Sequence, residues 1–203
     1  MPQFDKSYWE EHWATRPDPE PRTLPTNPYL PLETTGLQPT TVLDAGCGTG
    51  AEALWLAEHG WQVTAADISA TALATARARA IASDLAGVVD WVEVDLSRWA
   101  PARTWDLVVT SYAHSELGQL EFYRRISSWV AQGGTLLIVG HLHDHGHHQQ
   151  HPVHATASRA AITGLFADAD WRIESDYEST RAVHPDGKAL RLHDVVVRAR
   201  RVS

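Results

Sequence analysis

The pattern of apolar and polar positions divides this chain near residue 40 into an irregular amino-terminal part and a regular remainder. In residues 4–14, Trp9 and Trp13 stand four positions apart, which predicts a short helix with both indoles on one face. Residues 16–33 contain six prolines, which break helices and favour extended chain. Two interpretations of this segment stay open: a linker, or an arm folded over a cleft.

From residue 40 onward, strand-like and helix-like patterns alternate. Short apolar, β-branched runs predict strands at residues 40–46, 61–67, 88–95, 105–112, 134–141, 171–180 and 190–201. Apolar residues that recur every three to four positions predict helices at residues 51–60, 70–85, 119–134 and 155–169. Ser69 is the expected N-cap of the second of these helices.

This order of elements predicts a single α/β domain over residues 1–203. Alternating strands and helices form a mostly parallel sheet with helices on both faces, because the crossovers are right-handed. A Pro-Asp-Gly turn within residues 184–188 joins the last two strands directly, which makes the last strand antiparallel. We therefore expect an amino-terminal helix and proline-rich arm in residues 1–38 and the core sheet in residues 39–203.

Composition narrows the function classes. The net charge is −8 with two lysines and no basic run, which argues against a nucleic-acid partner. Cys47 is the only cysteine, so no intrachain disulfide can form. No apolar run approaches the roughly 18 residues that a bilayer requires, so we expect a cytoplasmic protein with no membrane partner. The nine tryptophans predict a core, and a ligand pocket, rich in aromatic side chains.

The most informative segment is VLDAGCGTG, residues 42–50, between a predicted strand and a predicted helix. Its glycines allow a tight turn and close approach of a ligand. Asp67 follows Gly46 by twenty-one residues, at the end of the next strand, where a carboxylate can accept hydrogen bonds from both ribose hydroxyls of an adenosine. GCGTGA also satisfies a loose nicotinamide-binding pattern, but Asp44 would repel a pyrophosphate and favours a cationic ligand.

Five segments together carry a family resemblance. VLDAGCGTG resembles the first motif of class I S-adenosylmethionine-dependent methyltransferases, and VTAADIS resembles the acidic second motif. DWVEVDLSRW resembles the third motif, WDLVVTSYAHSEL the fourth strand with its loop, and GGTLLIVGH the fifth strand. With FDKSYWEEHW in front, the whole chain is similar to small bacterial methyltransferases of the tellurite-resistance and thiopurine types. The resemblance implies a Rossmann-like sheet and S-adenosylmethionine as the cofactor.

Carried over position by position, the resemblance implies a cofactor site at the ends of three successive strands. Asp95 would hold the adenine amino group, and the Leu96 backbone N–H would hold a ring nitrogen. The expected cofactor-binding residues are Asp44, Gly46, Cys47, Gly48, Thr49, Gly50, Asp67, Ile68, Asp95, Leu96 and Ser111.

The predicted function is methyl transfer to an O, S or N nucleophile of a small-molecule acceptor, by in-line displacement. A hydroxyl or amine acceptor benefits from a nearby base, whereas a thiol or soft anion needs less help. The candidate catalytic residues follow the fourth and fifth strands and are Tyr112, His114, His141 and His143. The candidate acceptor-side wall is Trp9, Trp13 and Tyr29. The alternative is a protein that binds S-adenosylmethionine or a metal on the same fold without turnover.

Residues 139–154 hold seven of the twelve histidines. Three interpretations stay open: a polar lid over the acceptor, a base or orienting group at His141 or His143, and a metal site. Against metal, the segment has no cysteine and contains the flexible Gly146, so its spacing is too loose for a closed tetrahedral site. We therefore predict no physiological metal ligand.

Overall fold

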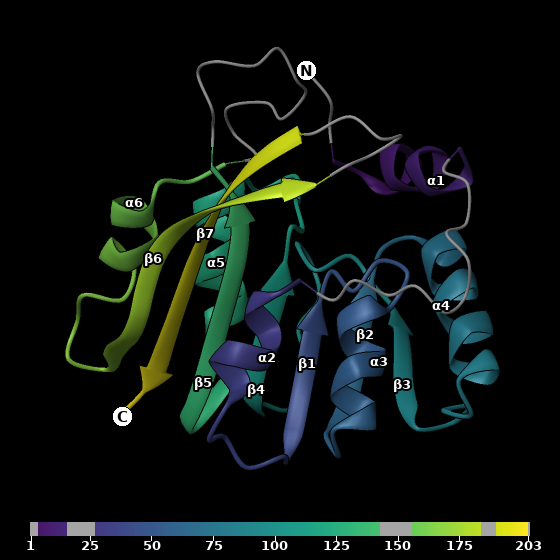
Figure 1. Cartoon of the computed structure of the whole chain (residues 1–203), viewed down its shortest axis with the longest axis horizontal. Helices are drawn as coiled ribbons and strands as arrows, with labels where there is room; N and C mark the ends of the chain where they lie inside the picture. Colours follow the sequence, from purple (N-terminus) through teal and green to yellow (C-terminus); the bar gives the residue numbers. More distant parts are fainter. Residues whose placement is uncertain (1–3, 16–26, 143–155, 184–189, 203) are drawn as a thin grey trace.

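The computed structural model describes residues 4–15, 27–142, 156–183 and 190–202 (Figure 1). Within these residues the strands form one seven-stranded sheet in the order β3-β2-β1-β4-β5-β7-β6. The strands are β1 (Thr41–Ala45), β2 (Gln62–Asp67), β3 (Val89–Glu93), β4 (Trp105–Ser111), β5 (Val130–His141), β6 (Trp171–Val183) and β7 (Leu190–Arg201). The helices are α1 (Lys6–Ala14), α2 (Tyr29–Thr34), α3 (Ala51–Glu58), α4 (Ala70–Ala82), α5 (Gln119–Ser127) and α6 (Arg159–Gly164).

Strands β1 to β5 pair in parallel, and β7 is antiparallel to both of its neighbours. This confirms the predicted fold class, a class I Rossmann-like sheet with an antiparallel last strand. The arrowheads of the parallel strands point to one edge of the sheet, and α1 lies at that edge (Figure 1). The carboxyl edge of such a sheet is where ligands bind in open α/β folds.

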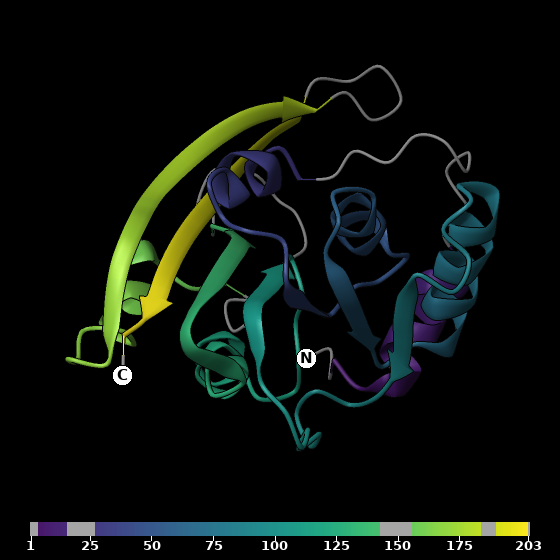
Figure 2. The same cartoon turned by 90° about the horizontal axis from the view of Figure 1, so that it is seen from below.

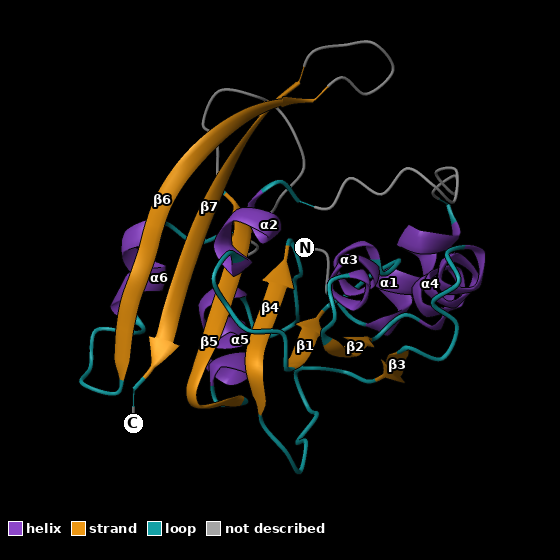
Figure 3. Ribbon diagram, turned by 60° about the horizontal axis from the view of Figure 1, so that its bottom comes forward, coloured by secondary structure: helices purple, strands orange, loops and turns teal. Residues whose placement is uncertain are grey.

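Two apolar clusters cover the two faces of the sheet. Helices α2 and α3 pack on one face and α5 and α6 on the other, as the turned view also shows (Figure 3). Adjacent strand residues go to opposite faces: in β1, Val42 belongs to the first cluster and Leu43 to the second. In β5, Leu136 and Leu137 are divided in the same way. Continuous apolar runs in these strands therefore reflect burial on both sides.

Three predicted segments differ in the structure. The helix predicted over residues 155–169 spans only Arg159–Gly164. The proline-rich stretch contains a helix, α2, because Asn27 Oδ1 accepts hydrogen bonds from the backbone N–H groups of Tyr29 and Leu30 at 3.1 and 2.9 Å. Pro28 and Pro31 fit there, since the first N–H groups of a helix have no partner within it. The helix predicted over residues 119–134 ends at Ser127, and β5 begins at Val130. The expected turn at 184–188 lies outside the described residues.

Strands β6 and β7 are long and curve together along one side of the molecule (Figure 2). Their far ends reach the carboxyl edge of the parallel strands, where His141 of β5 is in register with Asp194 of β7. Asp194 is in turn in register with Ser179 of β6. The antiparallel hairpin therefore brings β6 side chains to the edge at which the parallel strands end. None of the helices in the described segments is long and apolar enough to cross a bilayer.

We predict that Leu136→Ala lowers the free energy of unfolding by about 2–5 kcal/mol, because it removes a fully buried side chain from a central strand. Leu32→Ala is the matched control, since Leu32 is 66% exposed and its truncation should change stability by no more than about 0.5 kcal/mol. Urea denaturation of both variants measures this difference. Equal effects of the two substitutions would contradict the packing described for β5.

Candidate functional site

The loop after β1 is tied to the neighbouring strand and approached closely from two sides. The backbone N–H groups of Gly46 and Cys47 donate to the Ala66 carbonyl at 2.8 and 3.1 Å. Gly46 has φ +82°, and a Cβ there would lie 2.4 Å from the Ala113 Cβ. Gly48 has φ +51°, and a Cβ there would lie 3.0 Å from the Trp13 ring. Glycine is thus required both for the backbone conformation and for space.

One buried and one partly buried acid lie next to this loop. Asp44 is 1% exposed, and its Oδ2 has no hydrogen-bond partner among the described residues. Burial raises the pKa of Asp44 well above its usual range, and the charges of Glu52 and Asp67 raise it further. Burial also raises the pKa of Glu52, opposed by hydrogen bonds from Asn27, whose backbone N–H donates to Glu52 Oε1 at 3.0 Å. A cation placed beside these acids would relieve both their repulsion and the unpaired oxygen.

Asp67 ends β2 and holds the loop with the same carboxylate that lines the cavity. Its Oδ2 accepts from the Gly48 N–H at 2.8 Å and its Oδ1 accepts from the Ser69 N–H at 2.9 Å. Burial raises the pKa of Asp67, although these two N–H groups favour the ionised form. Asp95, after β3, accepts from the backbone N–H of Ser97 and from Arg98 Nη1, both at 2.8 Å.

Helix α1 closes the site from above and is held by polar contacts. Glu10 accepts hydrogen bonds from the backbone N–H groups of Ala70 (2.7 Å) and Thr71 (3.2 Å) at the start of α4. This places a carboxylate at the positive end of a 13-residue helix. Lys6 of α1 pairs with Glu93 of β3 at 2.5 Å. These contacts hold the aromatic side chains of α1 over the glycine loop.

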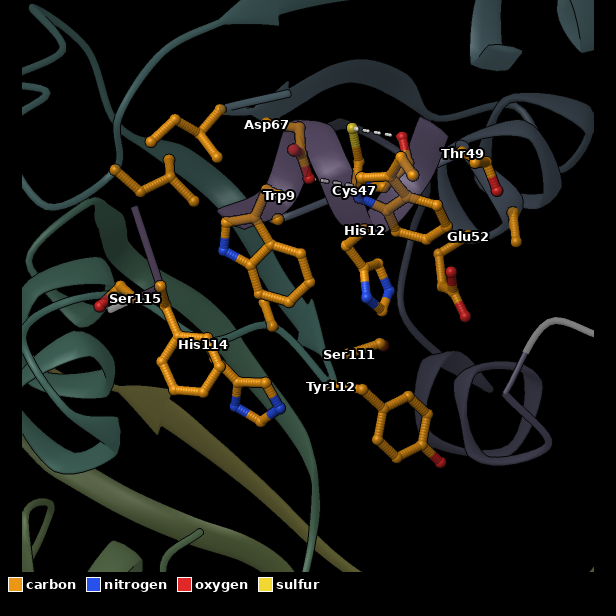
Figure 4. A pocket seen from close by; sticks show the side chains of 18 of the residues that line it. Trp9, His12, Cys47, Thr49, Glu52, Asp67, Ser111, Tyr112, His114 and Ser115 are labelled. Carbon is orange, nitrogen blue, oxygen red and sulfur yellow. Dashed lines mark hydrogen bonds between the residues drawn. The ribbon is translucent and has the colours of Figure 1, made fainter. Parts of the chain in front are cut away.

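These elements enclose one cavity of about 890 Å³. Its lining comes from α1, the loop after β1, the end of β2, and the end of β4 with its following loop (Figure 4). The labelled side chains that converge there are Trp9, His12, Cys47, Thr49, Glu52, Asp67, Ser111, Tyr112, His114 and Ser115. The volume lies near the upper end of the roughly 300–1,000 Å³ typical of small-molecule sites.

Opposite the acidic loop, the cavity wall is built on Asp194, which is fully buried. Its carboxylate accepts from Tyr29 (3.0 Å), Tyr112 (3.2 Å) and Arg181 Nε (2.6 Å), and His141 Nδ1 lies 2.9 Å from it. Burial alone would raise the pKa of Asp194, but the hydrogen bonds from His141 and Arg181 lower it below its usual range. Asp194 is therefore ionised at neutral pH and orients four side chains.

Two histidines that line this cavity have a defined tautomer, because each Nδ1 has a hydrogen-bond partner. Because Asp194 is ionised, His141 Nδ1 carries a proton and donates it, which makes Nε2 the acceptor when the ring is neutral. His114 Nδ1 lies 2.9 Å from Gln119 Oε1, while Gln119 Nε2 donates to the Ala113 carbonyl. His114 therefore also donates through Nδ1, and its neutral form also accepts through Nε2.

Tyr112 and Cys47 have raised pKa values. Burial raises the pKa of Tyr112, and the charge of Asp194 raises it further, so its hydroxyl stays protonated and serves as a donor. Tyr112 also has φ +58°, an uncommon conformation for a bulky residue, which turns its ring against His141 at 4.2 Å between centroids. Burial raises the pKa of the Cys47 thiol well above its usual range, as do Asp67 and Asp44. This thiol is not activated as a nucleophile.

Known proteins resemble this chain in sequence and in fold. A family model described as a methyltransferase domain matches residues 42–134. Trans-aconitate 2-methyltransferase of Streptomyces avermitilis is 31% identical over 143 residues, which are 67% of this chain and 50% of that protein. This chain thus spans about half the length of that relative.

Solved structures of other proteins have the same fold over nearly the whole length of this chain. One of them comes from work on the conversion of a disulfide bond into a thioacetal group during echinomycin biosynthesis. Its sequence is 26% identical to this chain, and the two structures align with a TM-score of 0.71. The alignment covers 97% of this chain and 92% of that one. The chain belongs to the class I S-adenosylmethionine-dependent methyltransferases. TehB from Haemophilus influenzae, 17% identical, shares the methyltransferase fold with TM-score 0.74, over 97% of this chain and 66% of that one.

The cavity fits S-adenosylmethionine, the cofactor of this family. The cofactor carries a sulfonium and an ammonium group, and Asp44 offers a buried, unpaired carboxylate oxygen at the glycine loop. The absence of a Cβ at Gly46 and Gly48 lets Ala113 and Trp13 lie close to the loop that lines this cavity. Asp67 and Asp95 line the same cavity at the ends of the next two strands. Asp44, Asp67 and Asp95 would hold its polar groups.

The structure places most predicted site residues together. Trp9, Trp13, Tyr112, His114 and His141 line the cavity. Most of the predicted cofactor-binding residues line it too, namely Gly46, Cys47, Gly48, Thr49, Asp67, Ile68, Asp95, Leu96 and Ser111.

Three predicted residues lie elsewhere. Asp44 lies beneath the loop, and Gly50, with φ +83°, precedes α3. Tyr29, expected on the cleft wall, is 5% exposed and lies behind it, because its hydroxyl donates to Asp194. His143 and the rest of the histidine stretch lie outside the described residues. In the described part of the chain, no group of three potential ligands is arranged to hold a metal ion.

Sequence reasoning missed several polar residues of the site. Asn27 links three elements: besides Glu52 and the start of α2, its Nδ2 donates to Ser111 Oγ at 2.8 Å. Glu52 stands two residues after the glycine loop, and this position could have identified it as a site residue. Asp194 is an isolated acid in an apolar strand, which is a weak signal. Arg181 and Glu10 offered none, since both contact residues far away in the sequence.

We predict that Gly46→Ala abolishes binding of S-adenosylhomocysteine, the demethylated cofactor, because the new Cβ would collide with Ala113. Gly87→Ala is the matched control: Gly87 has φ +79° but nothing within 4 Å of its Cβ position. Both variants bear the roughly 1–2 kcal/mol cost of a left-handed residue, but only the first should lose the ligand. Calorimetry measures binding and denaturation measures the shared cost. Equal affinities would contradict the close approach at Gly46.

We predict that Glu10→Ala loosens α1 without unfolding the sheet. Losing a cap on α4 costs about 1 kcal/mol, which corresponds to about fivefold faster amide exchange in α1. Hydrogen exchange read by mass spectrometry checks this. Glu11→Ala is the control, because Glu11 is exposed and its side chain makes no hydrogen bond or ion pair among the described residues. Identical exchange in the two variants would mean that Glu10 does not hold the helix.

Proposed function

We propose that the protein transfers a methyl group from S-adenosylmethionine to a small-molecule acceptor. The observation that carries the proposal is the arrangement of one cavity between two chemically different walls. One wall holds the glycine loop with Glu52 and Asp67, and the buried Asp44 lies beneath that loop; these acids suit a cationic cofactor. The other holds Tyr112, His114 and His141, which suit a polar acceptor.

The chain's own residues would act mainly by positioning. The cofactor supplies an electrophilic methyl group on a sulfonium, and an acceptor must meet it in line. Positioning two reactants in this way contributes up to roughly 7–11 kcal/mol in well-oriented systems. The rings of Trp9 and Trp13 on α1 cover the cavity and exclude water from it.

For a hydroxyl or amine acceptor, a histidine would take up the proton that the nucleophile loses. The acceptor nitrogen, Nε2, is defined by the partner of Nδ1 in both His114 and His141. A positioned base of this kind contributes about 10²–10⁴-fold in rate. Tyr112 acts as a wall, because its raised pKa keeps the hydroxyl protonated and that proton is donated to Asp194.

Three considerations favour a small molecule over a macromolecule. The cavity is covered by α1, which leaves room for a small acceptor but not for a folded one. The chain is acidic, with net charge −8, which disfavours a nucleic-acid substrate. The relative from Streptomyces avermitilis is named for a small acceptor, trans-aconitate.

We predict that Asp67→Asn weakens the affinity for S-adenosylhomocysteine by about 10–150-fold. The loss of a hydrogen bond to a charged group is worth about 1.5–3 kcal/mol, which gives this range. The control is Asp90→Asn, which removes an exposed acid from the adjacent strand β3 and should leave the affinity unchanged.

Turnover is the direct test. The wild-type protein is incubated with S-adenosylmethionine and either pooled small acceptors or ribosomal RNA, and the release of S-adenosylhomocysteine is measured. Release with the small acceptors alone supports the proposal. Cofactor binding without release in either arm supports a non-catalytic binding protein, and release with RNA alone contradicts the small-molecule acceptor.

A further inference from the structure

Arg181 is the only lysine or arginine among the described residues that line the cavity. It comes from β6, the outermost strand, and reaches the site because β6 and β7 extend past the carboxyl edge of the parallel strands. Its side chain is 27% exposed, so the guanidinium is desolvated on one side and accessible on the other. A cation in this position needs an explanation in a chain whose net charge is −8.

The guanidinium is fixed by contacts on its inner side. Nε donates to Asp194 Oδ2 at 2.6 Å, and Nη2 donates to the Tyr112 hydroxyl at 3.1 Å. The group also stands 5.6 Å from the centroid of the Tyr112 ring. These bonds use two of the five N–H groups of an arginine. Nη1 has no hydrogen-bond partner among the residues that the structure describes.

The negative charge of Asp194 is not compensated by Arg181 alone. The same carboxylate also accepts from Tyr29, Tyr112 and His141, so its negative charge is shared among four donors. Arg181 thus retains positive potential on the side that faces the cavity. A pair that served only to neutralise Asp194 would not need three further donors on the acid.

Charge is separated along the cavity. Asp44, Glu52 and Asp67 lie at the glycine-loop end, where the cationic cofactor belongs. Arg181 lies at the wall of Tyr112 and His141. An anionic acceptor would be repelled by the acids and attracted by Arg181, so this polarity favours one orientation in the cavity.

We propose that Arg181 binds a carboxylate of the methyl acceptor and thereby selects small organic acids. The inference rests on the function proposed above. A guanidinium matches a carboxylate in planar geometry and holds it by charge-assisted hydrogen bonds. Ion pairing lowers the nucleophilicity of the bound carboxylate. The bound group therefore orients the acceptor, and a different atom of the acceptor receives the methyl group.

The test measures binding of paired probes by calorimetry, with the protein saturated with S-adenosylhomocysteine. The pairs are succinate with dimethyl succinate, tricarballylate with its trimethyl ester, and benzoate with methyl benzoate. Each ester keeps the carbon skeleton and removes the charge. In the wild type, we expect at least one acid to bind about tenfold or more tightly than its ester, the factor for one charged hydrogen bond.

Three variants assign the preference to Arg181. Arg181→Gln should abolish the preference for the acid. Arg181→Lys keeps a charge that can pair with Asp194 but lacks the planar fork, so the preference should fall by about tenfold while the fold is kept. Arg172→Gln is the matched control, because Arg172 is on the same strand with a side chain 64% exposed, and it should keep the full preference.

The outcomes separate this inference from the proposed function. Wild-type protein that does not bind S-adenosylhomocysteine contradicts the proposed function itself. If that ligand binds normally but no acid is preferred over its ester, the inference is wrong. It is also wrong if the preference survives in Arg181→Gln; Arg181 would then be only the counter-ion of Asp194. If Arg181→Gln does not fold, the Arg181→Lys result decides: an undiminished preference overturns the inference.

Discussion

The buried carboxylate of Asp194 is the interaction on which the acceptor half of the site depends. An ion without solvent is costly to bury, and removing one of its partners leaves an uncompensated charge. The cost is offset here by four donors from four parts of the chain: Tyr29 of α2, Tyr112 after β4, His141 of β5 and Arg181 of β6. One acid on β7 thereby fixes the positions of side chains that the parallel sheet alone would not bring together.

The other half of the site depends on acids that are only partly compensated. Asp44 has an unpaired carboxylate oxygen, and its neighbours Glu52 and Asp67 are also acidic, so this end of the cavity is destabilised until a cation is present. At Asp194 the opposite holds, since protein donors satisfy the acid fully. The contrast explains why one cavity can hold a cationic cofactor at one end and a different ligand at the other. Binding at the first end relieves electrostatic strain, whereas the second end is already rigid.

The cofactor half was predictable from the sequence, and the acceptor half largely was not. Gly46, Gly48 and Asp67 belong to one strand–helix–strand unit, so their spacing along the chain fixes their arrangement in space. Asp194 and His141 are 53 residues apart and meet only because of the register between β5 and β7. Hydrophobic pattern predicts that these strands exist but not which residues stand opposite each other.

The expectation that the prolines exclude a helix was wrong at residues 29–34 for a local reason. Proline disfavours the interior of a helix, but Pro28 is the N-cap of α2 and Pro31 lies in its first turn, where a missing N–H costs nothing. Asn27 then completes the start of the helix and reaches Ser111 and Glu52 in the site.

The cover of the site differs from its walls in how it is held. Helix α1 contains no buried residue, and its polar attachments are the surface pair Lys6–Glu93 and the hydrogen bonds that Glu10 accepts at the start of α4. Exposed ion pairs contribute little to stability, so α1 is a weakly held element over a rigid sheet. Trp13 packs on Gly48, at the centre of the cofactor loop. A ligand that enters or leaves beneath α1 must therefore disturb contacts of low energy only, while the glycine loop and the Asp194 wall stay in place.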